Sequence, residues 1–438
     1  MADSTIPSSL DQPSAAKFWL AVLLTGIGSG VSAVILLRLL QIVQQVMWPD
    51  ANLLNAAAQA SPLRHVVVLL GAGVVTGAGQ VILVRLSSGN SIDITEAIWF
   101  SAGRLPALRT LGSAALSVII VGMGASLGRE GAPKQAGAVI ANALSDKGRL
   151  SDEQRRLLVA CGAGAGLAAA YGVPLGGALF ALEVLRGALA LRLVLPALLA
   201  SVVATAISWL FLPNAPTYFL PAFHNSVPDL FWAIFVGLIA GIVSVAFVRT
   251  IAWADRNRPE GRWRLVAPLF ALGLLGFISI PFPQLLGNGK DVAQLAFTNQ
   301  VAPLLLLALL FLKPAVTAMC LGSGAPGGLF TPSLALGALL GGSLGQVWSW
   351  LWPDTQPALF AVIGAGAVLA ATTQGPISAV VLIMELTGSD RSFIAPMLLA
   401  VVMATLVART IEPRSIYDAR LTDEQVAARQ KLREPATF

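Results

Sequence analysis

The fold of this chain is decided by a stretch that occurs twice, as CGAGAGLAAAYGVPLGGALFALEVLRG at residues 161–187 and as IGAGAVLAATTQGPISAVVLIMELTGS at residues 363–389. The two copies align without a gap, and most of the identical positions are Gly or Ala. Packing between membrane helices could explain small residues alone. It does not explain the matched Pro174/Pro376 and Glu183/Glu385 pairs, so the pattern indicates the internal repeat of a membrane transporter.

The repeat sets the expected organisation of the chain. We expect a transmembrane domain at residues 18–420, with a first repeat at about 60–250 and a second at about 265–412. A polar N-terminal segment at residues 1–17 precedes it. The polar tail at residues 421–438 is too short to fold as a regulatory domain.

The composition is that of a membrane protein. Hydrophobic residues make up 56% of the chain, charged residues only 11%, and mean hydropathy is +0.77, too few polar residues to cover a soluble domain of this size. Several apolar runs are shorter than the ~20 residues that a spanning helix needs, and Gly or Pro interrupts them. We expect discontinuous helices around a polar path. The apolar runs are 18–37, 66–84, 111–127, 194–212, 231–248, 265–280, 357–371 and 393–406.

The net charge of +6 does not indicate a nucleic-acid partner, because the basic residues gather in short connections between apolar runs. Such loops mark the cytoplasmic side of a membrane protein. Cys161 and Cys320 have no metal or redox spacing. The first apolar run lacks the features of a cleaved secretory signal, so we expect it to be retained.

The motif GASLGREGAPKQAG at residues 124–137 places Arg129 and Glu130 between glycines, directly after an apolar run. Ionisable groups at membrane depth are costly and usually functional. Flanking glycines let backbone N–H groups approach an anion, and Pro133 suits the first turn of a following helix. An ionised Glu130 would compete with the anion for those N–H groups, and protonation would release it. The alternative is a buried Arg129–Glu130 ion pair.

A second motif of this kind is GSGAPGGLFTP at residues 322–332, which leads into a long apolar helix. No Gly-Lys-Ser/Thr follows, so it is not a phosphate-binding loop. A plain turn between helices remains the simpler alternative. Its position after an apolar stretch favours a second helix entrance facing the same path.

Taken together, GREGAP, GSGAPGGLFTP, AAAYGVPLGGALFALE and the terminal PRSIYDA resemble the CLC chloride channels and H⁺/Cl⁻ antiporters, in particular the short ClcB-like bacterial branch, over residues 81–421. The resemblance implies an all-α polytopic fold with two inverted repeats and tilted, discontinuous helices. It also implies a multi-pass protein of the bacterial inner membrane that transports chloride, as an H⁺/Cl⁻ antiporter or a voltage-gated-type channel. Chloride, protons, the lipid bilayer and a second copy of the chain are the implied partners, and no cofactor is implied.

The resemblance also implies residue roles. Backbone N–H groups of Glu130 and Gly131, beside Arg129, would form an outer anion site, with the Glu130 side chain as its gate. Backbone N–H groups of Leu329 and Phe330 would form a central site. The Tyr417 hydroxyl would join them, although an interfacial aromatic is the simpler interpretation of that tyrosine.

Three positions depart from the family pattern. The early filter loop has no clean counterpart, and residues 89–93 are its expected equivalent, with Asn90 or the neighbouring Ser91 donating to the central anion. The internal proton glutamate of the antiporters aligns with Val184, so the neighbouring Glu183 serves, protons take a water path, or coupling is lost. Lys134 replaces an apolar residue and could either attract anions or snorkel.

Two other functions compete with chloride transport. The fluoride-exporting CLC branch shares an Asn in the filter, but GREGA and GGLFTP favour chloride. An intramembrane enzyme would need a nucleophile with a base, or metal ligands. His65 and His224 are the only histidines, and neither lies in a catalytic motif, so we expect no enzyme.

Overall fold

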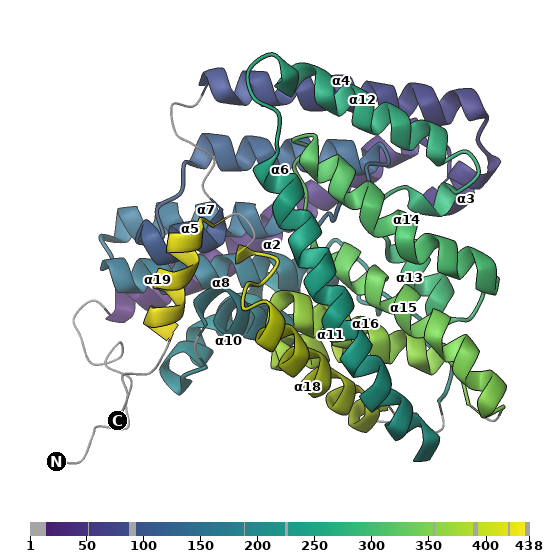
Figure 1. The fold of residues 1–438 in the computed structure, drawn as a ribbon. Coiled ribbons are helices and arrows are strands. Elements are labelled where there is room, and N and C mark those ends of the chain that lie inside the picture. Colours follow the sequence, from purple (N-terminus) through teal and green to yellow (C-terminus); the bar gives the residue numbers. More distant parts are fainter. Residues whose placement is uncertain are drawn as a thin grey trace.

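The computed structural model describes residues 15–50, 52–86, 93–187, 189–223, 227–353, 355–388, 393–418 and 421–433. Within these ranges the chain is a bundle of helices that cross one another at many angles (Figure 1). The one isolated β-bridge in this part of the chain joins Gly128 to Gly328. The all-α prediction is therefore confirmed.

Within the described residues, six helices are long and apolar enough to cross a membrane. They are α2 (Ala15–Met47), α4 (Pro62–Leu86), α11 (Val227–Arg256), α14 (Pro303–Gly322), α15 (Phe330–Leu351) and α18 (Ile394–Ile411). At 33 and 30 residues, α2 and α11 are about 45–50 Å long at ~1.5 Å per residue. Because a hydrocarbon layer is only ~30 Å thick, these two helices must tilt or project beyond it.

Most of the remaining helices are shorter, as expected for discontinuous segments. The remaining helices are α3 (Leu53–Gln59), α5 (Ile94–Phe100), α6 (Ala107–Gly122), α7 (Gly131–Gly148), α8 (Asp152–Tyr171), α9 (Pro174–Leu179), the π-helix η1 (Phe180–Arg186), α10 (Leu191–Trp209), α12 (Trp263–Ile278), η2 (Pro283–Leu285), α13 (Lys290–Phe297), α16 (Pro357–Thr373), α17 (Pro376–Thr387) and α19 (Asp423–Arg433). Helices α7, α8 and α10 are the longer ones among them, with 18, 20 and 19 residues.

Each predicted apolar run overlaps a helix, although the run 111–127 extends past the end of α6 at Gly122. The spanning helices α14 and α15 were not among the runs, and in α14 Lys313 interrupts the apolar pattern. That lysine is buried, and its ammonium donates to the carbonyl oxygens of Leu285 and Gly287 at 2.8 and 2.9 Å. Because backbone carbonyls replace water around the charge, the helix can hold it inside the protein.

The repeated sequences adopt the same local structure. Helix α8 ends at Tyr171, Gly172 takes a positive φ of 70°, and α9 begins at Pro174. In the second copy α16 ends at Thr373, Gln374 has φ of 59°, and α17 begins at Pro376. A left-handed residue stops the first helix, and proline fits the first turn of the next.

Glycine pairs bring the helices around this repeat into close contact. A Cβ on Gly137 of α7 would collide with the carbonyl oxygen of Gly162 in α8. The corresponding helices of the second half meet in the same way, at Gly337 of α15 and Gly364 of α16. Backbones that approach this closely fix α7 and α15 against their neighbours.

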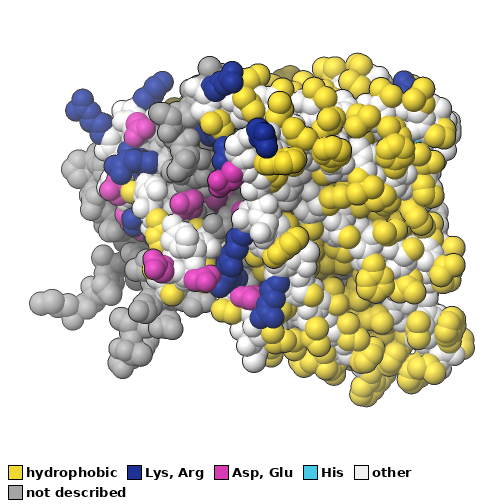
Figure 2. All heavy atoms as spheres, turned by 45° about the horizontal axis from the view of Figure 1, so that its top comes forward, with side chains coloured by type: hydrophobic (Ala, Val, Ile, Leu, Met, Phe, Trp, Pro, Cys, Tyr) yellow, Lys and Arg dark blue, Asp and Glu magenta, His cyan; other side chains and the backbone are white. Residues whose placement is uncertain are grey.

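The surface divides into an apolar belt and a charged end. Hydrophobic side chains cover most of the visible face in Figure 2, and Lys, Arg, Asp and Glu side chains gather toward one end. Ion pairs at helix ends include Arg155 of α8 with Asp146 of α7, and Arg256 of α11 with Asp423 of α19. With its apolar spans, this arrangement is that of a multi-pass membrane protein.

Candidate anion-binding site

Two glycine-rich loops, one before α7 and one before α15, meet in the interior. The N–H of Gly128 donates to the carbonyl oxygen of Gly328 at 2.8 Å, and the N–H of Gly328 returns a bond to Gly128 at 2.7 Å. This bridge lies immediately before both helices begin, at Gly131 and Phe330. The N-terminal ends of α7 and α15 therefore meet at one point, where their unpaired N–H groups favour a negative charge.

The negative charge at this point is supplied by Glu130, whose side chain is fully buried. Its Oε1 accepts hydrogen bonds from the backbone N–H of Phe330 at 2.7 Å and of Thr331 at 3.4 Å. Its Oε2 accepts from the hydroxyl of Thr331 at 3.1 Å and from the hydroxyl of Tyr171 at 3.4 Å. A carboxylate that fills such a ring of donors occupies the place that a small anion would take.

The carboxylate comes from one loop and most of its donors come from the other. Glu130 is the residue before α7, yet its side chain makes no cap bond to α7. It reaches across the bridge to the first turn of α15 instead. The carboxylate and most of its hydrogen-bond donors thus belong to different halves of the chain, and relative movement of the halves would change the site.

Glycines make room for this arrangement. A Cβ on either Gly128 or Gly328 would collide with the carboxylate oxygens of Glu130. Any side chain at these positions would push the carboxylate away or separate the loops. Gly128 and Gly328 are therefore required by space, in addition to the backbone freedom that the sequence suggested.

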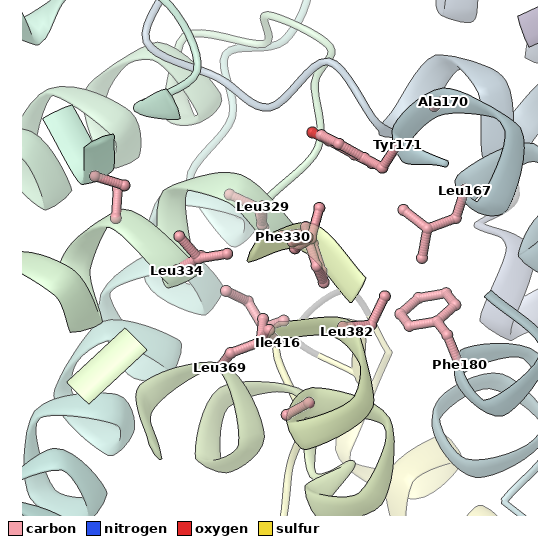
Figure 3. Packing of buried hydrophobic residues seen from close by; sticks show 14 of the residues in the cluster. Leu167, Ala170, Tyr171, Phe180, Leu329, Phe330, Leu334, Leu369, Leu382 and Ile416 are labelled. Atoms are coloured by element: carbon pink, nitrogen blue, oxygen red, sulfur yellow. The ribbon is translucent and has the colours of Figure 1, made fainter. Parts of the chain in front are cut away.

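Arg129 stands beside the site. Its guanidinium carbon lies 5.2 Å from the centre of the Tyr171 ring, within the range of a cation–π contact. Among the described residues no ion pair joins Arg129 to Glu130. In Figure 3 the Tyr171 side chain points from the end of α8 toward the start of α15, where Leu329 and Phe330 lie.

A cavity adjoins the buried carboxylate. It is lined by Asp93, Ile94 and Thr95 at the start of α5, by Gly131, Lys134 and Gln135 of α7, by Leu185, by Gly327, Gly328 and Leu329, and by Ile416 and Tyr417. The Tyr417 ring packs edge-on against Phe180 at 5.5 Å. Its hydroxyl is 3.4 Å from the Lys134 ammonium.

The structure thus brings together Glu130, Gly131, Leu329, Phe330 and Tyr417, which come from three separate segments of the chain; Glu130 and Phe330 alone are 200 residues apart. Asn90 and Ser91 lie outside the described residues, so their participation stays a prediction. No group of three or more His, Cys, Asp or Glu side chains that could hold a metal occurs within the described ranges.

Glu183, which the sequence placed on a possible proton route, caps a helix. Its carboxylate accepts from the backbone N–H groups of Ile377 and Ser378, at 3.1 and 2.6 Å, and from the Ser378 hydroxyl at 2.6 Å. The matching Glu385 accepts from Leu175 and Gly176 at the start of α9. Each repeat therefore caps a helix of the other, and proton transfer by Glu183 stays a prediction.

Two further residues of the site, Tyr171 and Thr331, lie inside the sequence motifs, but the sequence pattern predicted no function for them. Their hydroxyl oxygens are 2.7 Å apart, and both contact the Glu130 carboxylate. Tyr171 occupies the last position of the repeated helix, directly before the break, where Thr373 stands in the second copy. The sequence feature that could have identified Tyr171 is a polar side chain at the end of a membrane helix, where polar groups are usually functional.

Residues 72–409 match the sequence profile of a family described as "Voltage gated chloride channel". Over 380 residues the chain is 31% identical to "Voltage-gated ClC-type chloride channel ClcB" of Citrobacter koseri, covering 84% of this chain and 89% of that protein. It is 36% identical over 339 residues to "Putative chloride channel protein ClcB-like" of Ralstonia nicotianae, covering 74% and 77%.

Solved structures agree with the fold. A slow cyanobacterial Cl⁻/H⁺ antiporter superposes with a TM-score of 0.81 and 25% identity, over 94% of this chain and 99% of that one. A CLC-type fluoride/proton antiporter reaches a TM-score of 0.76 at 23% identity, over 92% and 98%. The second likeness shows the shared fold alone.

Proposed function

We propose that this chain, which belongs to the voltage-gated chloride channel (CLC) family, carries chloride across the bacterial inner membrane along a path gated by Glu130. The observation that carries the proposal is the Glu130 carboxylate itself. It is fully buried and hydrogen-bonded to the N-terminal turn of α15, at 2.7 Å from the Phe330 nitrogen. No mobile anion can use those donors until the carboxylate leaves them.

The gate works through competition for hydrogen-bond donors. Ionised Glu130 satisfies the backbone N–H groups of Phe330 and Thr331 and the hydroxyls of Thr331 and Tyr171. A proton on the carboxyl weakens its hold as an acceptor, because the charge that strengthens these bonds is gone. Chloride then takes the freed donors, held by backbone dipoles without a full positive charge and therefore able to leave.

Proton-coupled exchange follows if the proton that opens the gate comes from one side of the membrane and leaves on the other. A relative with 31% identity over 329 residues is named "H(+)/Cl(-) exchange transporter ClcA", from Vibrio parahaemolyticus. Val184, buried beside Glu183, carries no proton. We propose that Glu130 is the essential carboxyl for exchange and that the second proton position is Glu183 or water.

We also propose how the chain sits in the membrane. The end rich in Lys and Arg faces the cytoplasm, by the bias of positive loops to that side. The assembly is a homodimer with one path in each subunit, as the family resemblance implies. The mass of the purified protein in detergent, measured by light scattering, tests the second statement: a monomer mass would contradict it.

The function is tested with purified protein in liposomes. Chloride efflux and proton movement are recorded together under an imposed chloride gradient, with fluoride run alongside. We expect chloride efflux coupled to uphill proton uptake, and slower fluoride efflux. Chloride flux without proton movement would restrict the protein to a channel. Fluoride flux that exceeds chloride flux would contradict the choice of substrate, and no anion flux at all would contradict transport.

A further inference from the structure

We propose that four arginines at the charged end of the molecule bind the phosphate of an anionic phospholipid. They are Arg85 in the last turn of α4, Arg109 in the first turn of α6, and Arg262 and Arg264 at the start of α12. We call these four residues the arginine cluster. None of them lines the cavity beside Glu130, so the lipid site is separate from the anion path and does not depend on it.

The cluster forms where helix ends meet. Helices α4 and α12 lie side by side and antiparallel (Figure 1). Gly73 of α4 contacts Leu269 of α12. Gly77, one turn closer to the end of α4, contacts Leu265, one turn closer to the start of α12. The last turn of α4, with Arg85, therefore lies beside the connection that leads into α12.

Helix α6 joins this junction from the other side of α4. Leu116 contacts Gly79, and Gly112, one turn earlier in α6, contacts Leu83, one turn later in α4. Helix α6 therefore also runs antiparallel to α4, and its first turn lies at the end of α4. That turn carries Arg109, so three helices contribute arginines to one place on the surface.

No carboxylate of the described residues neutralises the arginine cluster. The ion pairs in this part of the chain include none of its four members, and Arg109 is repelled by Arg264. Glu260, in the turn before α12, is exposed and forms no ion pair with them. Arg155 at the same end of the protein pairs with Asp146. Positive charges that gather without such a partner attract an anion from outside the chain.

The surroundings of the cluster fit a lipid. Trp263, the first residue of α12, is 56% exposed, and the Arg262 guanidinium lies 5.9 Å from the centre of its ring. Tryptophan collects at the boundary between membrane and water. Leu265 and Leu108 next to the cluster are also exposed. A headgroup phosphate can therefore meet the guanidinium groups while its acyl chains lie against these leucines.

The side-chain type points to phosphate. A guanidinium group donates two parallel N–H bonds to two oxygens of one phosphate, which an ammonium cannot do. A phosphate bound by Arg109 and Arg264 would also remove the repulsion between α6 and α12. A zwitterionic lipid carries its own cation beside the phosphate, so we expect the cluster to prefer a headgroup with a net negative charge.

Native mass spectrometry of the full chain in detergent, titrated with phosphatidylglycerol, tests the site. Arg109→Gln/Arg264→Gln removes two charges from the cluster. The matched control, Arg64→Gln/Arg149→Gln, removes two charges from exposed arginines elsewhere. We expect the first variant to weaken phosphatidylglycerol binding at least about tenfold and the control to stay within about twofold of wild type. Phosphatidylcholine should bind all three proteins equally and more weakly than phosphatidylglycerol binds the wild type.

Size-exclusion profiles and thermal midpoints identify the folded variants. If Arg109→Gln/Arg264→Gln does not fold, Arg85→Gln/Arg262→Gln replaces it, because both of those side chains are exposed. Weakening of less than about threefold in the folded cluster variant would overturn the proposal, and so would equal weakening in the control. Displacement of the lipid by excess inorganic phosphate would identify free phosphate as the ligand and would also overturn it.

Discussion

The loop before α7 and the loop before α15 have the same build but opposite chemical roles. Both are rich in glycine, both lead into a helix, and they bond to each other at Gly128 and Gly328. The first loop supplies a carboxylate, Glu130, and the second supplies the N–H groups that bind it. Two loops of similar build thus bring two helix ends together, and the one acidic side chain between them is the gate that we propose.

The two loops differ in their chemical roles, whereas the two glutamates of the repeated helices have the same role. Glu183 and Glu385 occupy matching positions and do the same work, each capping a helix of the other half. Both are hydrogen-bonded to helix N-termini, as Glu130 is, yet only Glu130 is fully buried in the interior. We therefore propose that the buried position of Glu130, and not the type of contact it makes, distinguishes it as a gate from the two caps. The predictions below test that distinction.

The largest effect is expected from Glu130→Gln. The amide keeps the size of the side chain but cannot be ionised, so it no longer competes as an anion or carries a proton. We expect proton coupling to fall by at least about tenfold while chloride flux continues, measured together in liposomes. Coupling and pH dependence that both survive in Glu130→Gln would contradict the gate assignment.

The second effect concerns the caps, with Glu183→Gln and Glu385→Gln as matched variants. Each substitution weakens two or three hydrogen bonds to a helix N-terminus, and we expect each to lower the free energy of unfolding by about 1–2 kcal/mol. Chloride flux should persist in both. Thermal or denaturant unfolding in detergent measures the loss.

The same two variants, Glu183→Gln and Glu385→Gln, test whether Glu183 also transfers protons. A fall in proton flux confined to Glu183→Gln would add a proton-transfer role to the cap. Equal proton flux in the two variants would leave Glu183 as a cap only. Unchanged stability in both variants would contradict the capping interpretation.

A smaller effect is expected from Tyr171→Phe, which removes one hydroxyl from the ring of donors around Glu130. Loss of one hydrogen bond to the carboxylate makes protonation easier. The midpoint of the activation of chloride flux by acid should therefore move to higher pH by about 0.5–1 unit, the equivalent of ~1 kcal/mol. The shift should vanish when Tyr171→Phe is combined with Glu130→Gln. A shift that persists in the double variant would place the effect elsewhere.

The smallest effect is expected at the filter loop, outside the described residues. The family resemblance implies that Asn90 donates to the central anion, and substitution by Ser would change that donor. We expect a modest rise in selectivity for chloride over nitrate, measured by competition flux in liposomes. Unchanged selectivity would mean that another residue of the loop, such as Ser91, holds the donor position.

The sequence was informative about the fold because two kinds of pattern reinforced each other. Apolar runs located the helices, and the paired Pro174/Pro376 and Glu183/Glu385 positions revealed the repeat. Helices α14 and α15 were missed as apolar runs, and in α14 Lys313 interrupts the pattern. Only the fold shows that the carbonyl groups near Leu285 and Gly287 surround that charge, since these partners come from a separate segment.

The sequence by itself determined that the chain is a multi-pass helical protein with a repeat, and it singled out both glycine-rich loops and Glu130. These conclusions follow from hydropathy, from helix-breaking residues and from the cost of a charge in a membrane, all of which are local. The tertiary structure decided which donors Glu130 meets, that Tyr171 and Thr331 complete them, and that Glu183 caps α17. It also placed Lys134 beside Tyr417, 283 residues away. Such pairings depend on how the two halves pack against each other, and no local pattern in the sequence records them.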